Sequence, residues 1–175
     1  IANYTYRSPE YFTDYFKNYN EIKEHWNMVS TKDKTDIFLG AANLLETKYY
    51  DKMLAYTIAG QNKNIYEAEI DAICELSDFL RFNVRYFDLI QQKQPLSAPF
   101  VHNYSEYNPL NVFVASITPF NFTAIGGNLA SAPLLFGNTV LWKPSDNAVL
   151  SNYLFYQIML EAGLPKGVLN FCPND

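Results

Sequence analysis

The sequence has few of the residues that build metal centres, disulfide scaffolds or membrane spans. It contains two Cys and two His among 175 residues. Cys74 and Cys172 lack CxxC spacing, and His25 and His102 each stand alone. This pattern predicts no metal site and no disulfide; the cysteines fit a reduced interior, and each histidine fits a surface or partly buried position. No apolar run reaches the roughly 18 residues of a membrane span, so we expect no membrane insertion.

Positive charge is also scarce. Thirteen Lys and Arg stand against eighteen Asp and Glu, and the net charge is -5. Without a basic cluster, a surface that binds nucleic acid is not expected, and the fourteen Tyr are interpreted as core residues.

No charged leader with an apolar run and a small-residue cleavage site is visible. Because the chain starts at Ile1 rather than Met, earlier removal of an N-terminal targeting segment fits the sequence.

The chain is rich in hydrophobic and aromatic residues. Hydrophobic residues make up 49% and aromatic residues 17%, enough to bury a sizeable core in one domain or slightly more.

The pattern of the first half predicts four amphipathic helices, over residues 8–26, 30–46, 49–64 and 65–91. Ser8 and Ser30 are the expected N-caps of the first two, and the third is expected to stop at 60–64. The inward positions expected for the first are Phe12, Phe16, Tyr19, Ile22 and Trp26; for the second, Ile37, Phe38, Ala41, Leu44 and Leu45; for the fourth, Ile70, Ile73, Cys74, Leu76, Leu80 and Phe87.

The second half changes to alternating strands and helices. We predict two strands separated near Asn108 and Pro109, the second entering the interior at Val112. Then follow a helix over 123–136, a strand over 139–144, a helix over 147–162 and a strand over 167–173. This order predicts an α/β fold: an N-terminal helical layer (1–95), a strand segment of an oligomerisation region (96–111), and the first βαβαβ of a parallel, Rossmann-like sheet (112–175), with the helices on its faces.

Ligands of parallel sheets bind beyond the carboxyl ends of the strands. Those ends are predicted at 118–121, 143–146 and 172–175. There is no GxGxxG and no GxxxxGK[ST], so motifs alone indicate no nucleotide site. Lys143 ends an apolar strand, but the same segment reads as a helix entry capped by Ser145 or Asp146. Asn121, taken alone, is interpreted as a turn or N-cap residue.

One family pattern covers these strand ends. The stretch "SITPFNFTAIGGNLASAPLLFGNTVLWKPSD" contains P-[FW]-N-[FY] followed by K-P-[SA]-[DE]. It resembles the start of the cofactor-binding domain of the aldehyde dehydrogenase superfamily. "EAEIDAICELSDFLRFNVRY", "QKQPLSAP" and "TAIGGNLASAP" resemble, within it, the delta-1-pyrroline-5-carboxylate dehydrogenase subfamily. The similarity runs from about His25 to Asp175.

The resemblance implies a role for each strand end. Asn121 matches the asparagine whose amide stabilises the oxyanion formed when a cysteine thiolate attacks the aldehyde. For the cofactor NAD, Lys143 matches the lysine that reaches the adenosine ribose, and Thr118 matches a main-chain contact. Pro119 and Phe120 line the same wall, Ser145 adjoins the lysine, and Asp146 stands where many relatives carry a ribose-binding Glu. The resemblance also implies that Phe122 and Glu75 lie beside the substrate. From the residues alone, Phe122 could equally be a core residue and Glu75 a solvated surface residue.

For the parent protein, the resemblance implies NAD-dependent oxidation of the small molecule glutamate γ-semialdehyde, derived from pyrroline-5-carboxylate, to glutamate in proline catabolism. It further implies a homo-oligomer in the mitochondrial matrix, with a cytoplasmic location as the alternative. The family's nucleophilic Cys and general-base Glu would lie beyond residue 175, so we expect these 175 residues alone to be inactive. The alternatives are another NAD(P)-dependent aldehyde dehydrogenase and a non-enzymatic structural relative.

Overall fold

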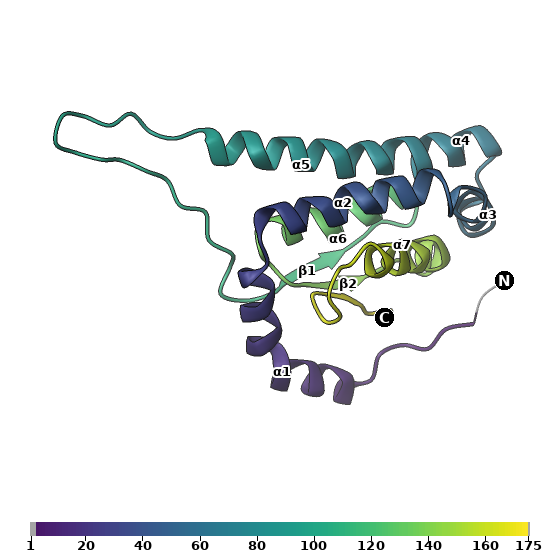
Figure 1. The fold of residues 1–175 in the computed structure, drawn as a ribbon. Coiled ribbons are helices and arrows are strands. Elements are labelled where there is room, and N and C mark those ends of the chain that lie inside the picture. The colour runs from purple at the N-terminus through teal and green to yellow at the C-terminus, as the bar shows by residue number, and fades with distance from the viewer. Residues whose placement is uncertain (1–2, 175) are drawn as a thin grey trace.

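The computed structural model describes residues 3–174, which form helical layers packed on a small parallel sheet (Figure 1). The predicted strand end at 172–175 therefore includes one residue, Asp175, that lies outside the described residues. The elements run α1 (Pro9–Met28), α2 (Thr31–Glu46), α3 (Tyr50–Gln61), α4 (Ile65–Glu69), η1 (Ile70–Glu75), α5 (Leu76–Gln92), β1 (Val114–Ile117), α6 (Thr123–Leu135), β2 (Val140–Lys143), η2 (Asp146–Ala148), α7 (Val149–Glu161) and β3 (Leu169–Phe171).

Local sequence signals set several helix ends. The Ser30 side chain accepts a hydrogen bond from the Asp33 N–H, which confirms the predicted N-cap of α2. At the end of α3, Asn62 adopts the left-handed conformation with φ of 54°, a backbone region that asparagine tolerates better than most residues. Asn64 and Glu67 then form a capping box that opens α4. The predicted chain reversal over 60–64 is thus confirmed, and asparagine residues form it as expected.

The three strands lie in the order β1-β2-β3, and both pairs are parallel. Parallel neighbours need crossover connections, which α6 and α7 provide. Both helices pack against the sheet, and α2 and α5 pack over them in turn (Figure 1). The shared core of these layers is formed by fully buried side chains such as Trp142, Phe155 and Leu134. The predicted βαβαβ order is therefore confirmed.

The long helix predicted over 65–91 contains a π-helical turn that periodicity did not indicate. In η1 the Leu76 N–H donates to the Asp71 carbonyl, five residues earlier. The wider turn moves Asp71 to the inward side, where it is only 1% exposed. The predictions that Ile70 and Cys74 face inward are wrong: Ile70 is 64% exposed and Cys74 is exposed. At about 100° per residue, neither lies on the side of the helix that carries the buried Leu76.

The helix α1 contributes less to the core than its apolar pattern predicts. Of the five positions expected inward, only Trp26 is buried, and its indole N–H donates to the Leu134 carbonyl at 3.1 Å. Phe16 is exposed, and its ring contacts those of Tyr15, Tyr19 and Phe113. Figure 1 shows α1 at the border of the molecule, so its apolar pattern meets few partners among the described residues.

The strand predicted before Asn108 is not formed. Residues 96–106 extend from the body of the molecule as an arm (Figure 1), in which an isolated bridge between Ala98 and Val101 is formed. Residues 107–111 return to the body, where the Leu110 N–H donates to the Asn138 side chain. A strand needs a neighbour for its backbone N–H and C=O groups, and the described chain offers none there. Val112 is also exposed rather than interior, and β1 begins at Val114. The division of the chain at 95 and 111 stays a prediction.

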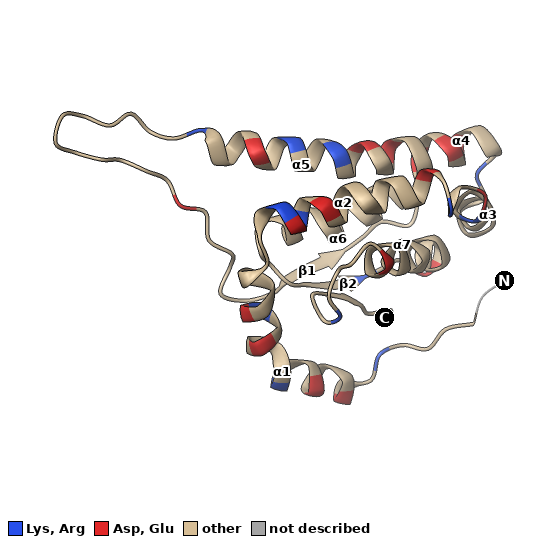
Figure 2. Cartoon of the chain, viewed as in Figure 1, with Lys and Arg blue, Asp and Glu red and all other residues tan. Residues whose placement is uncertain are grey.

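Charged residues of both signs occur on several of the helices but not on α6. Figure 2 shows Lys or Arg beside Asp or Glu on α1, α2 and α5, whereas the arm is almost uncharged. Between Gln94 and Asn111 the only Asp, Glu, Lys or Arg is Glu106. Within residues 3–174, no helix is long and apolar enough to span a membrane.

Replacing either of two helical glycines by alanine should change the free energy of unfolding, in opposite directions. A Cβ on Gly127 would lie 2.6 Å from Leu76 Cδ1 and 3.1 Å from Phe155 Cε1, both on fully buried side chains, so Gly127→Ala should destabilise by about 1–3 kcal/mol. A Cβ on Gly40 in α2 meets nothing nearer than 3.8 Å, so Gly40→Ala should stabilise by about 0.5–1 kcal/mol. Urea unfolding of both variants of the complete protein checks this; a similar shift for both would contradict the packing described here.

Candidate functional site

The carboxyl ends of β1 and β2 lie side by side. The strands pair Ile117 with Lys143, so the segments that follow leave the sheet together. The Thr118 N–H donates to the Lys143 carbonyl at 3.1 Å, and the Trp142 indole N–H donates to Thr118 Oγ1 at 2.9 Å. Thr118 is buried by these contacts. The structure thus brings together the two residues that the resemblance assigns to one cofactor.

Between β1 and α6 the chain runs through a short exposed turn. Phe120 is 61% exposed, Pro119 is half-buried and Asn121 is exposed. No hydrogen bond involves the Asn121 carboxamide within residues 3–174. The N-cap of α6 is Phe122, which is extended at φ of -138° and makes no side-chain cap bond. The interpretation of Asn121 as an N-cap is therefore wrong, whereas its place in a turn is confirmed.

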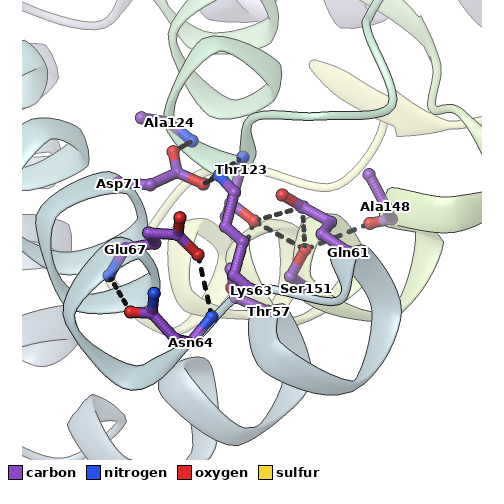
Figure 3. Close-up of polar contacts among 10 residues, drawn as sticks. All are labelled: Thr57, Gln61, Lys63, Asn64, Glu67, Asp71, Thr123, Ala124, Ala148 and Ser151. Carbon is purple, nitrogen blue, oxygen red and sulfur yellow. Dashed lines mark hydrogen bonds and ion pairs between the residues drawn. The ribbon is translucent and has the colours of Figure 1, made fainter.

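The start of α6 is capped from a distant element. Asp71 in η1 accepts hydrogen bonds from the Ala124 N–H on Oδ1 at 2.8 Å and from the Thr123 N–H on Oδ2 at 2.9 Å (Figure 3). Lys63 forms an ion pair with Asp71 at 2.5 Å, and its Nζ lies 4.3 Å from the centroid of the Phe122 ring. Sequence reasoning missed Asp71 and Lys63. Asp71 lies in the stretch "EAEIDAICELSDFLRFNVRY" that resembles the subfamily, but the resemblance implies no role for it, and Lys63 lies outside that stretch. A regular helix would also not turn Asp71 inward.

The Thr123 hydroxyl ties the same helix start to two further helices. It lies 3.1 Å from Thr57 Oγ1 of α3 and 2.9 Å from Ser151 Oγ of α7, and it accepts a hydrogen bond from Gln61 Nε2 at 2.7 Å (Figure 3). Ser151 Oγ donates in turn to the Ala148 carbonyl at 3.2 Å. Buried hydroxyls that share such bonds fix one arrangement of the helices they join.

Phe122 and Glu75 both interact with the Asp71–Lys63 pair. Phe122 lines a pocket of about 420 Å³ together with Asn62, Lys63, Glu67, Ile70 and Asp71. Glu75, also in η1, is half-buried, and burial raises the pKa of its carboxyl; the Asp71 charge raises that pKa further, and Lys63 opposes both. The interpretation of Phe122 as plain core is not supported, because its ring borders a pocket.

At the end of β2, Lys143 is half-buried, and no hydrogen bond or ion pair involves its Nζ among the described residues. Ser145 precedes η2 but makes no side-chain cap bond; only its carbonyl accepts, from the Ala148 N–H. Asp146 is exposed and accepts from the Tyr6 hydroxyl at 3.2 Å. A hydrogen bond to Asp146 also raises the pKa of Tyr4 to about 12. Ser145 thus stands at the N-cap position of η2, so the predicted helix entry is confirmed, but no side-chain cap bond is formed there.

The two cysteines lie in different environments. Cys74 is exposed, which contradicts the expected interior position, and Cys172 is buried. Burial raises the pKa of the Cys172 thiol to about 11, so at neutral pH this group is protonated and a weak nucleophile. Over residues 3–174, no group of three or more His, Cys, Asp or Glu side chains is arranged to hold a metal ion.

Comparisons with known proteins extend these observations. The chain is 51% identical over 176 residues to the probable delta-1-pyrroline-5-carboxylate dehydrogenase of Schizosaccharomyces pombe, with 100% of the chain and 32% of that protein covered. It is 49% identical over 153 residues to the mitochondrial delta-1-pyrroline-5-carboxylate dehydrogenase of Homo sapiens, covering 87% of the chain and 27% of that protein. The chain thus spans about a third or less of the length of these curated relatives.

A solved structure of a protein with a similar name also resembles this chain. The NAD-bound crystal structure of the delta-pyrroline-5-carboxylate dehydrogenase of Mycobacterium tuberculosis matches with a TM-score of 0.86 and 48% identity, over 89% of this chain and 29% of that one. A family model described as the aldehyde dehydrogenase family matches residues 1–175. With this match over its whole length, and with P-F-N-F and K-P-S-D placed at adjacent strand ends, the chain belongs to the aldehyde dehydrogenase family.

Proposed function

We propose that the complete protein containing this chain oxidises L-glutamate γ-semialdehyde, the open form of pyrroline-5-carboxylate, to L-glutamate with NAD, the second step of proline catabolism. The observation that carries the proposal is Asn121, an amide without protein partners among the described residues, on an exposed turn at the carboxyl end of β1. The names of the relatives supply the substrate, and the Mycobacterium tuberculosis structure, bound with NAD, supplies the cofactor.

An amide at this position suits acyl chemistry. When a thiolate attacks an aldehyde, the carbonyl oxygen becomes an alkoxide, which is stabilised by a hydrogen-bond donor already in place. A neutral amide donates without carrying a proton that the thiolate could remove. The nucleophilic Cys and the general-base Glu are proposed to lie outside these 175 residues, since Cys172 is buried and neither cysteine stands in the nucleophile's sequence context. Residues 1–175 alone are accordingly proposed to be inactive.

The cofactor is proposed to lie over the ends of β1 and β2. Lys143 would donate to the adenosine ribose through a side chain that has no protein partner among the described residues. Thr118, Pro119 and Phe120 would form one wall, and Ser145 and Asp146 would border the ribose. NAD, when bound, accepts a hydride from the substrate carbon. A carboxylate beside the ribose disfavours a 2′-phosphate, so NAD rather than NADP is proposed.

The substrate side is proposed at Phe122 and Glu75. The exposed edge of the Phe122 ring would pack on the aliphatic part of the semialdehyde, while Glu75 would lie near its polar end. The relatives named mitochondrial support a mitochondrial matrix location, with the cytoplasm as the alternative. A homo-oligomer is also proposed; the arm carries exposed apolar residues such as Leu96 and Phe100, which a second copy would cover.

The test is NADH formation by the complete protein, offered pyrroline-5-carboxylate and, in parallel, short aliphatic aldehydes. We expect strong preference for pyrroline-5-carboxylate and much faster turnover with NAD than with NADP at low cofactor concentration. Preference for simple aldehydes would point to another aldehyde dehydrogenase and discard the proline-catabolic role. No turnover with any aldehyde would favour a non-enzymatic relative, and equal use of both cofactors would overturn the preference for NAD.

A further inference from the structure

We propose that Asp71, paired with Lys63, is a positioning residue that holds the Asn121 amide in its reactive orientation through the backbone of Thr123 and Ala124. This inference rests on the proposed function, because it assigns Asn121 to the reaction. Asn121 itself makes no hydrogen bond within the described residues, so its side chain is placed only by the chain on either side. A catalytic donor must be held close to its productive position, since small displacements cost large factors in rate.

On the carboxyl side of Asn121, three successive residues are held by the same ion pair. Lys63 lies over the Phe122 ring at 4.3 Å, and the two oxygens of Asp71 receive the N–H groups of Thr123 and Ala124. The residues joined are far apart in sequence, since Thr123 follows Asp71 by 52 positions. The turn is therefore attached to η1 rather than capped locally.

The chemistry of this contact is that of a strong helix cap. A carboxylate at a helix N-terminus is favoured by the helix dipole, and both of its oxygens are occupied by orphan N–H groups of the first turn. Asp71 is 1% exposed, a position where a lone negative charge would be costly. Lys63 supplies the opposite charge at 2.5 Å, and its own side chain is 14% exposed. In this pair the Asp71 carboxylate is buried and bonded at both oxygens, the Lys63 side chain is largely buried, and both residues directly adjoin the turn.

The experiment is a double-mutant cycle in the complete protein between Asp71→Asn and Asn121→Ala. Asparagine keeps the shape of Asp71 but can accept at only one atom, so one of the two N–H groups loses its partner. We expect Asp71→Asn to lower kcat by about 10-fold to 100-fold with a smaller change in the KM for NAD, and to change kcat less than 3-fold in the Asn121→Ala background. Such non-additivity is what action through Asn121 requires.

Asp33→Asn is the matched control. It makes the same change from carboxylate to amide in the first turn of a helix, but its carboxylate accepts from the Ser30 hydroxyl at the start of α2, and it does not line the Phe122 pocket. We expect less than a 2-fold change in kcat. Amide hydrogen exchange gives a readout independent of activity: a peptide covering residues 122–126 should exchange faster in Asp71→Asn and unchanged in Asp33→Asn.

Each outcome decides the proposal. Equal losses of kcat in the two backgrounds, or wild-type kcat in folded Asp71→Asn, would overturn it. If Asp71→Asn does not fold, Lys63→Met takes its place in the cycle, since methionine keeps contact with Phe122 while removing the charge. If the wild-type protein oxidises no aldehyde, the proposed function fails in the first assay and this inference fails with it. An active wild type with an additive cycle overturns the role of Asp71 alone.

Discussion

Replacing Asn121 by alanine in the complete protein is expected to lower kcat for pyrroline-5-carboxylate by about 100-fold to 1,000-fold, the usual loss when one oxyanion donor is removed. The KM for NAD should change little, because the amide acts on the reacting oxygen and not on the cofactor. The thermal midpoint should stay within about 1 °C, since Asn121 is exposed and makes no hydrogen bond in residues 3–174. Initial rates and a thermal melt, measured side by side, check both statements.

A matched exposed asparagine provides the control. Asn20 lies on the outer side of α1, away from the strand ends, and Asn20→Ala should leave kcat and the midpoint unchanged. Asn121→Asp is a second variant of the same size; it places a negative charge where an alkoxide develops and should be at least as slow as the alanine variant. Full activity in Asn121→Ala would remove this residue from the reaction, while unfolding of the variant would give it a structural role.

Trp142→Ala is expected to produce the largest loss of stability, about 3–5 kcal/mol in the free energy of unfolding. The side chain is fully buried, with its ring edge-on to Phe171 at a centroid distance of 5.2 Å and to Phe155 at 6.2 Å. Its indole N–H holds Thr118 at the end of β1. Truncation would leave a cavity between the sheet and α7 and would remove that bond.

Two comparisons separate the causes. Trp142→Phe retains most of the apolar contact but not the indole N–H, so its loss should be smaller, about 1–2 kcal/mol. Phe82→Ala removes a large aromatic ring that is about half exposed on α5 and should cost less than about 1 kcal/mol. Urea unfolding followed by circular dichroism measures all three. A Trp142→Ala loss no greater than that of Phe82→Ala would contradict the central place of Trp142 in the core.

The parts of the fold that were predictable depend on local signals. Ser30 caps α2 as its spacing to Asp33 indicates, and the βαβαβ order follows from apolar runs separated by Gly137 and Gly163, both at positive φ. The errors lie where structure depends on partners distant in sequence. The strand predicted before Asn108 has no neighbour to pair with, and Asp71 is turned inward by a π turn that leaves no mark in a 3.6-residue pattern.

The candidate site was predictable only through its motif. Asn121 and Lys143 stand out because they belong to two short patterns with family-specific spacing. Asp71 and Lys63 belong to neither, and their contacts with Thr123 and Phe122 exist only in the folded chain. A carboxylate that bonds to backbone N–H groups needs no particular partner side chain. No pairing of residue types in the sequence could therefore have indicated it.

The π turn also contains one residue more than an ordinary helical turn needs. Removing one residue from 72–75 would change the bond from the Leu76 N–H to the Asp71 carbonyl from a five-residue to a four-residue spacing, which is that of an α-helix. Asp71 would then keep its place at the first turn of α6, whereas straightening the turn without a deletion would rotate every earlier side chain by about 100° relative to α5. In relatives of any sequence, a one-residue gap at η1 is therefore compatible with the same support of this turn.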